Sequence, residues 1–227
     1  FDTMNYSELL DNVRNYTEVG SEVLSNSVIN VFITNVEDKI QKQLDLDAFR
    51  KFATSSLTIG TPFLTVPDDF DFERGIQIVD ANADRTWLEQ RDTTFIDEYN
   101  VDRTNNTGTP RYYANWDQNT FILAPTPNAA ITVELWYNRT PERLGNGSSG
   151  TSTTTYLSNT ASEVLIYGTV SEAFSYLKNP TYVQLYEQKY NQAVQGLSTT
   201  QMGRKRRDEY ADGVLRVPLK SVAPGGN

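Results

Sequence analysis

The sequence of 227 residues contains no histidine and no cysteine. These absences exclude disulfide bonds, cysteine nucleophiles, serine–histidine relays and zinc or copper sites built on thiolate or imidazole ligands. Any catalysis would therefore depend on carboxylate, lysine, tyrosine or serine side chains. The chain also lacks a continuous run of about 18 apolar residues, so we expect no membrane-spanning helix and no membrane partner.

Basic residues are in the minority. The sequence contains 20 Lys and Arg and 29 Asp and Glu, which gives a net charge of −9 at pH 7. Such a chain repels duplex DNA and anionic lipid, which argues against a conventional nucleic-acid-binding protein. Hydrophobic residues make up 38% of the sequence and aromatic residues 11%, as is typical of a globular protein with a sizeable core.

Helical periodicity dominates the N-terminal region. It predicts one helix that begins after a cap formed by Asn5 and Glu8 and ends at Gly20. A second, longer helix follows, and a break near Asp45 separates it from an apolar extension. The apolar positions of the first helix are Tyr6, Leu9, Leu10, Val13 and Tyr16; those of the second helix and its extension are Val28, Ile29, Phe32, Ile33, Val36, Ile40, Leu44, Leu46, Phe49 and Phe52.

From Ser56 to about Arg143 the apolar period changes to two, and clusters of Gly, Pro, Asn and Asp separate the apolar segments. This pattern predicts an antiparallel meander or a small barrel, with one helical turn at residues 94–99. The predicted strand residues are Leu57 and Ile59, Ile76 and Ile78, Phe121 to Leu123, and Ile131, Val133 and Leu135.

Helical periodicity returns after residue 155. Thr160 and Glu163 predict a capping box, and Asn179-Pro180 predicts the join between two further helices. We therefore predict an α+β protein. In this scheme residues 1–55 and 158–203 form a helical bundle, residues 56–144 an inserted antiparallel β domain, residues 145–157 a flexible loop, and residues 204–227 an extended C-terminal arm.

Several patterns invite a chemical interpretation. The Gly-rich stretch 145–150 matches GxGxxG, but no buried strand precedes it and no helix follows, so a loop is the better interpretation.

The acidic run Asp68, Asp69, Asp71 and Glu73 is either a metal site or a solvated turn, and we favour the turn. The aromatic residues form either a sugar-stacking platform or cross-strand core pairs, and we favour the core. These residues are Tyr112, Tyr113, Trp116, Trp136 and Tyr137. We predict no catalytic residue, no metal and no cofactor.

The C-terminal segment differs in charge from the rest of the chain. Residues 204–227 hold six basic and three acidic side chains, a net charge of +3, and leave −12 for residues 1–203. A basic segment with alternating apolar residues suits docking to an acidic protein surface. The residues predicted to bind a partner are Arg204, Lys205, Arg206, Arg207, Val214, Leu215, Val217, Pro218 and Leu219.

The order of several short motifs resembles that of the head-to-tail adaptor proteins (neck or tail-tube-type connectors) of tailed bacteriophages. The resemblance covers most of residues 5–210. It is carried by Val66-Pro67-Asp68-Asp69-Phe70, Gly108-Thr109-Pro110-Arg111-Tyr112-Tyr113-Ala114, Leu123-Ala124-Pro125-Thr126-Pro127, Trp136-Tyr137, Leu165-Ile166-Tyr167-Gly168, Glu172-Ala173, Tyr176-Leu177-Lys178, Tyr186, Tyr190 and the basic run from Arg204 to Asp208.

The resemblance implies a non-enzymatic virion protein that forms a homo-oligomeric ring, usually twelve-fold, between the capsid portal and the tail. In such a ring the helices build the ring, the β domain faces tail, nozzle or tail-terminator proteins, and the C-terminal arm reaches into the portal protein. DNA passes through without specific binding, and the protein is in the host cytoplasm during assembly and in the virion neck afterwards. The alternative from the residues alone is a carbohydrate-binding or carbohydrate-active β domain on a helical stalk.

Overall fold

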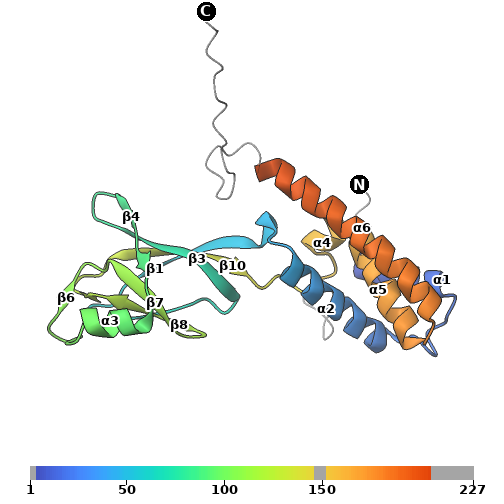
Figure 1. Cartoon of the computed structure of the whole chain (residues 1–227), viewed down its shortest axis with the longest axis horizontal. Helices are drawn as coiled ribbons and strands as arrows, with labels where there is room; N and C mark the ends of the chain where they lie inside the picture. Colours follow the sequence, from blue (N-terminus) through green and yellow to red (C-terminus); the bar gives the residue numbers. More distant parts are fainter. Residues whose placement is uncertain (1–3, 146–151, 206–227) are drawn as a thin grey trace, which may run out of the picture. The chain divides into compact units, whose positions relative to one another are not determined.

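The computed structural model describes residues 4–145 and 152–205 and divides them into two compact units. The helical unit comprises residues up to Ile40 together with those from Leu157 onward, and the β unit comprises Gln41–Tyr156. Figure 1 shows helices at both ends of the chain and strands between them. The predicted α+β class, with an antiparallel β region inserted between helical segments, is confirmed.

The helical unit contains the apolar faces that the sequence pattern indicates. The Asn5–Glu8 capping box is present at the start of α1, where Asn5 Oδ1 accepts from the backbone N–H of Glu8 and the Glu8 carboxylate accepts from that of Asn5. Pro180 opens α6 as predicted, since proline needs no backbone N–H partner in the first helical turn. The helices are α1 (Tyr6–Thr17), α2 (Asn26–Gln43), α4 (Tyr156–Thr160), α5 (Ser162–Tyr176) and α6 (Pro180–Lys205).

Gly168 lets three helices approach closely. A Cβ atom at this position would lie 2.6 Å from Val36 Cγ1 on α2 and 3.1 Å from Tyr190 Cδ2 on α6. Tyr190 is almost fully buried, and burial raises the pKa of its hydroxyl to about 12. The glycine in the Leu165-Ile166-Tyr167-Gly168 motif is therefore required by packing.

The β unit is a small sandwich of two four-stranded sheets. Sheet A has the strand order β1-β10-β3-β4 and sheet B the order β2-β8-β7-β5. The strands are β1 (Arg50–Ser56), β2 (Phe63–Thr65), β3 (Phe70–Val79), β4 (Arg85–Trp87), β5 (Glu89–Gln90), β6 (Thr107–Gly108), β7 (Tyr112–Asp117), β8 (Thr120–Ala124), β9 (Thr126–Pro127) and β10 (Thr132–Arg139); the 3-10 turn η1 is Asp47–Phe49 and the short helix α3 is Thr93–Tyr99.

The core of the β unit lies between the two sheets. Alternate residues of the central strands point into it, including Ile76 and Ile78 from β3, Leu135 from β10, and Phe121 and Leu123 from β8. The outer face of sheet B is covered by α3, whose Ile96 packs on Ala114, Ile122 and Ala124. On the outer face of sheet A, Phe52, Trp87 and Trp136 are exposed, whereas Gln77 and Asn138 are buried.

Several expected boundaries were wrong. Strand β1 begins at Arg50, within the region predicted to be helical, and Phe52 lies on that strand rather than on a helical apolar face. Leu57 and Ile59 follow β1 instead of forming a strand. Because β1 pairs with β10, the sheet is also not a simple meander, and β5–β7 and β6–β9 add short parallel pairs.

Helix ends differ as well. Glu18, with a left-handed backbone φ of 56°, ends α1 before Gly20 is reached. Thr160 belongs to α4, and α5 follows Ala161 without a side-chain cap. Helix α4 also begins within the predicted 145–157 loop, because Leu157 is buried. Residues 146–151 of that loop lie outside the described residues. The predicted division of the chain into a helical bundle, a β domain, a loop and a C-terminal arm remains a prediction.

Candidate functional site

The predicted partner-binding residues lie at the end of the chain. The backbones of Arg204 and Lys205 belong to α6, so the expectation of an extended arm is wrong for these two residues. The remaining predicted docking residues lie outside the described part of the structure; they are Arg206, Arg207, Val214, Leu215, Val217, Pro218 and Leu219. Their role remains a prediction.

The acidic run does not converge on one point. Asp69 pairs with Lys51, Asp71 accepts a hydrogen bond from Gln41, and Glu73 accepts from Gln90 and Asn115. Within residues 4–145 and 152–205, no group of three or more acidic side chains is placed to hold a metal ion. In the described structure these carboxylates act as acceptors of separate polar contacts.

The aromatic group divides between core and surface. Tyr113 and Tyr137 are buried between the sheets, as the core interpretation predicts. For Trp116 and Trp136 that interpretation is wrong, since both side chains are exposed. The alternation along β7 and β10 explains the difference, because successive side chains of a strand point to opposite faces.

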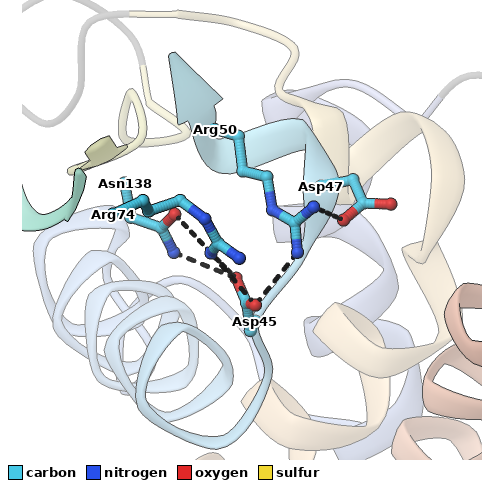
Figure 2. Close-up of polar contacts among 5 residues, drawn as sticks. All are labelled: Asp45, Asp47, Arg50, Arg74 and Asn138. Atoms are coloured by element: carbon cyan, nitrogen blue, oxygen red, sulfur yellow. Dashed lines mark hydrogen bonds and ion pairs between the residues drawn. The ribbon is translucent and has the colours of Figure 1, made fainter. Parts of the chain in front are cut away.

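A polar cluster marks the start of the β unit (Figure 2). Asp45 accepts hydrogen bonds from Arg50 Nη2 at 3.1 Å, Arg74 Nη1 at 3.1 Å and Asn138 Nδ2 at 3.0 Å. Arg50 also pairs with Asp47 at 2.9 Å, and Arg74 Nη1 donates to Asn138 Oδ1 at 3.1 Å. One carboxylate thus ties the chain before β1 to three neighbouring strands.

The electrostatics of this cluster favour the charged form of Asp45. Partial burial acts to raise its pKa, but the hydrogen bonds from Asn138, Arg74 and Arg50 outweigh that effect and lower the pKa to about 2. Arg74 reaches the cluster because β3 is irregular there. Gly75 pairs with Trp136 and Glu73 with Tyr137, which leaves Arg74 as the extra residue of a bulge.

A second polar contact stabilises the neighbouring part of the sheet. The buried Tyr137 donates from its hydroxyl to Asp69 Oδ1 at 2.7 Å, and Lys51 Nζ contacts Asp69 Oδ2 at 2.8 Å. Burial raises the pKa of Tyr137, and the hydrogen bond to Asp69 raises it further. For Asp69, the bonds from Lys51 and Tyr137 outweigh burial and lower the pKa.

A row of three aromatic side chains crosses the outer face of sheet A. Phe52 on β1 is opposite Trp136 on β10, with ring centroids 5.6 Å apart, and Trp87 on β4 lies 6.3 Å from Trp136. Trp87 covers Gly75, where a Cβ atom would lie 2.8 Å from the indole. We call Phe52, Trp136 and Trp87 the aromatic row.

The helical unit has aromatic contacts of another kind. Tyr186 on α6 meets Tyr16 from α1 and both Phe174 and Tyr167 from α5, with centroid separations of 5.4–6.3 Å. Lys189 lies 5.0 Å from the centroid of Tyr186. These rings link three helices.

Sequence reasoning missed the Asp45 cluster and the aromatic row. The available signals were Asp45 at the end of a helical pattern and Gly75 inside a strand, since an internal glycine often marks a bulge or a close approach. The partnership between Arg74 and Asn138 spans 64 residues, which no local pattern specifies.

Within the part of the chain that the structure describes, no helix is long and apolar enough to cross a membrane.

Comparisons with known proteins identify the family. No curated protein matches the chain. The sequence matches the SU10 adaptor protein family over residues 4–218, which includes both units. A match of this extent shows that the chain belongs to the SU10 adaptor protein family.

Proposed function

We propose that this protein is a structural adaptor of a bacteriophage virion, which forms a closed ring at the neck and joins the portal to the tail. The observation that carries the proposal is membership of the SU10 adaptor protein family over residues 4–218. Its role is mechanical rather than catalytic, and it requires neither metal nor cofactor.

A closed ring of identical copies needs two different complementary surfaces on each copy. Exposed apolar side chains of the helical unit supply candidate contacts for such an interface. On α2 and α6 they include Val31, which is 57% exposed, and Leu185, which is 44% exposed. We propose that the helical units form a ring of twelve copies, while the β units face tail, nozzle or tail-terminator proteins.

The charge of the chain suits a channel for DNA. A net charge of −9 disfavours stable contact with phosphate groups, so a lumen formed by such copies allows DNA to slide through. The +3 segment at residues 204–227 has the opposite charge. We propose that it docks on an acidic surface of the portal protein, with Leu215, Val217 and Leu219 supplying apolar contacts.

Electron microscopy of the purified protein, alone and mixed with portal assemblies, tests the proposal. We expect twelve-membered rings seated on the portal. Deletion of residues 208–227 should leave the melting temperature nearly unchanged and abolish portal binding. A full-length variant with serine at positions 215, 217 and 219 keeps the length of the segment and tests its apolar side chains separately.

Undiminished portal binding by both variants would show that the C-terminal segment is not the docking element. Monomers or open filaments at every protein concentration, with and without portal, would contradict the ring.

A further inference from the structure

Sheet A ends in two open edges. Strands β1 and β4 lie at its two ends, and no strand in the described part of the chain pairs with their outer sides. Strand β1 is seven residues long, whereas the other edge strands of the two sheets, β2, β4 and β5, have three, three and two residues. Because short edge strands limit pairing with other chains, a long open edge such as β1 is a place where another strand can add.

The outer side of β1 has backbone groups available for pairing. The N–H of Leu57 donates to Ile131 in the segment that leads into β10. Backbone direction alternates along a strand, so the N–H and C=O groups of Phe52 and Thr54 point away from β10. No backbone hydrogen bond from a described residue outside the sheet reaches either residue.

The outer side of β4 is open in the same way. The N–H of Leu88 donates to Ile76 on β3. By the same alternation, the backbone groups of Arg85 and Trp87 point away from β3, and no described residue outside the sheet bonds to them. Each edge therefore offers two residues whose N–H and C=O groups face outward.

The strand directions make these two edges complementary. All three pairings in sheet A are antiparallel, so β1 and β4, at opposite ends of four strands, run in opposite directions. Copies related by rotation about an axis along the strands keep their directions, and β4 of one copy then meets β1 of the next in antiparallel orientation. Such a head-to-tail contact closes into a ring.

The aromatic row reaches both edges. Phe52 on β1 and Trp87 on β4 are 58% and 57% exposed, and both lie on the outer face of sheet A. Pairing Trp87 with Phe52 of the next copy joins outward-facing backbone groups on both sides and keeps the two rings on one face. The same register pairs Arg85 with Thr54 of the next copy.

The charges across this join are complementary. The Arg85 side chain is 58% exposed and contacts Glu134, two strands away in its own copy, at 3.5 Å. In the next copy Glu134 lies opposite Thr54, so Arg85 would face a small threonine with a carboxylate directly behind it. The register places no cation opposite another cation.

We propose that β4 of one copy pairs with β1 of the next, so that sheet A continues from copy to copy and the aromatic row becomes a continuous band. The two pairs, Trp87 with Phe52 and Arg85 with Thr54, each exchange two backbone hydrogen bonds. The inference rests on the closed ring proposed above and adds a contact between β units to that between helical units. A two-fold pairing of β1 with β1 would leave Trp87 at an open edge.

Disulfide cross-linking of the full-length protein tests this join, because the natural chain contains no cysteine. The double variant Thr54→Cys/Arg85→Cys has one cysteine on each edge. Within one copy three strand spacings, about 14 Å, separate the two positions, which is too far for an internal disulfide. Mild oxidation, with and without portal assemblies, should give a ladder of covalent oligomers on a non-reducing denaturing gel.

A matched control moves one cysteine to the other face of the sheet. In Ser55→Cys/Arg85→Cys the first position is also exposed, but its side chain points away from the outer face, so the yield should fall about tenfold or more. A mixture of the single variants Thr54→Cys and Arg85→Cys should stop at dimers.

A proline variant tests the join without cysteine. Thr54→Pro removes an N–H that faces outward, and proline is tolerated at such positions of edge strands. It should leave the melting temperature of the dilute protein nearly unchanged and reduce the number of rings seen by electron microscopy. Rings as abundant as those of the wild type would contradict the join.

The outcomes separate this inference from the proposed ring. Rings without cross-links in the double variant would overturn the join and leave the ring to the helical units. Cross-linked ladders without closed rings would support the join and contradict the proposed ring, and monomers throughout would contradict both. Dimers of Thr54→Cys alone would assign β1 to a two-fold contact, and equal yields from the double variant and its control would mean random collision; either result overturns the join.

Discussion

The helical unit and the β unit both contain clusters of aromatic rings, but the rings serve different purposes in the two units. In the helical unit, Tyr186 on α6 contacts rings from α1 and α5, and among the described residues no backbone hydrogen bond joins these three helices. In the β unit, the aromatic row lies on strands that the sheet already holds together. A buried ring that bridges separate elements is therefore structural, whereas an exposed ring on a sheet adds little to what the backbone already joins.

The sharpest test of this difference removes one ring from each unit. Tyr186→Ala should destabilise the protein by about 3 kcal/mol, since it deletes a largely buried ring shared by three helices. Trp87→Ala should cost less than about 1 kcal/mol, because the side chain is mostly exposed. Chemical denaturation measures both effects, and similar losses for the two variants would contradict the comparison.

Two glycines on neighbouring helices, Gly168 on α5 and Gly196 on α6, test whether close packing requires a glycine. Gly168→Ala should destabilise the helical unit by about 1–3 kcal/mol, because the new Cβ overlaps Val36. Gly196→Ala makes the same change on α6, where no atom lies within 4 Å, and should stabilise the protein by about 0.5–1 kcal/mol. Effects of the same sign would show that Gly168 is not held by close packing.

In the β unit, the internal contact to test is the hydrogen bond from the Tyr137 hydroxyl to Asp69. Tyr137→Phe removes the hydroxyl that donates to Asp69 and should reduce the free energy of unfolding by about 1.5 kcal/mol. Tyr176→Phe, at an exposed position of the helical unit, should change it by less than about 0.5 kcal/mol. Hydrogen exchange should show the loss in β10 and not in α5.

The sequence predicted elements whose signals are local. The Asn5–Glu8 cap, the start of α6 at Pro180 and the alternation of Val133 and Leu135 were all correct, since each depends on residues a few positions apart. Strand β1 was missed because its residues are exposed on both faces except Ala53, so they show no apolar alternation. Its strand conformation depends on pairing with β10, about 80 residues away, as does the aromatic row.

The Asp45 cluster shows the same dependence on distant partners, and its contribution should vary with pH. The pKa of Asp45 is lowered from 3.8 to about 2 in the folded protein, so its contribution is complete above about pH 4 and is lost as the pH falls toward 2. The side chain is 42% exposed, so solvent screening reduces the contribution to about 1 kcal/mol. Asp45→Asn should therefore be less stable than the wild type by about this amount at pH 7.

That difference should narrow toward zero near pH 2, where the native carboxylate is also becoming neutral. Denaturant titrations of both proteins between pH 7 and pH 2 measure it, and hydrogen exchange locates it. Exchange in β1 and β3 should differ between the two proteins at pH 7, whereas exchange in α5 should not. A stability difference that is the same at every pH would mean that Asp45 acts through its shape and hydrogen bonds rather than through its charge.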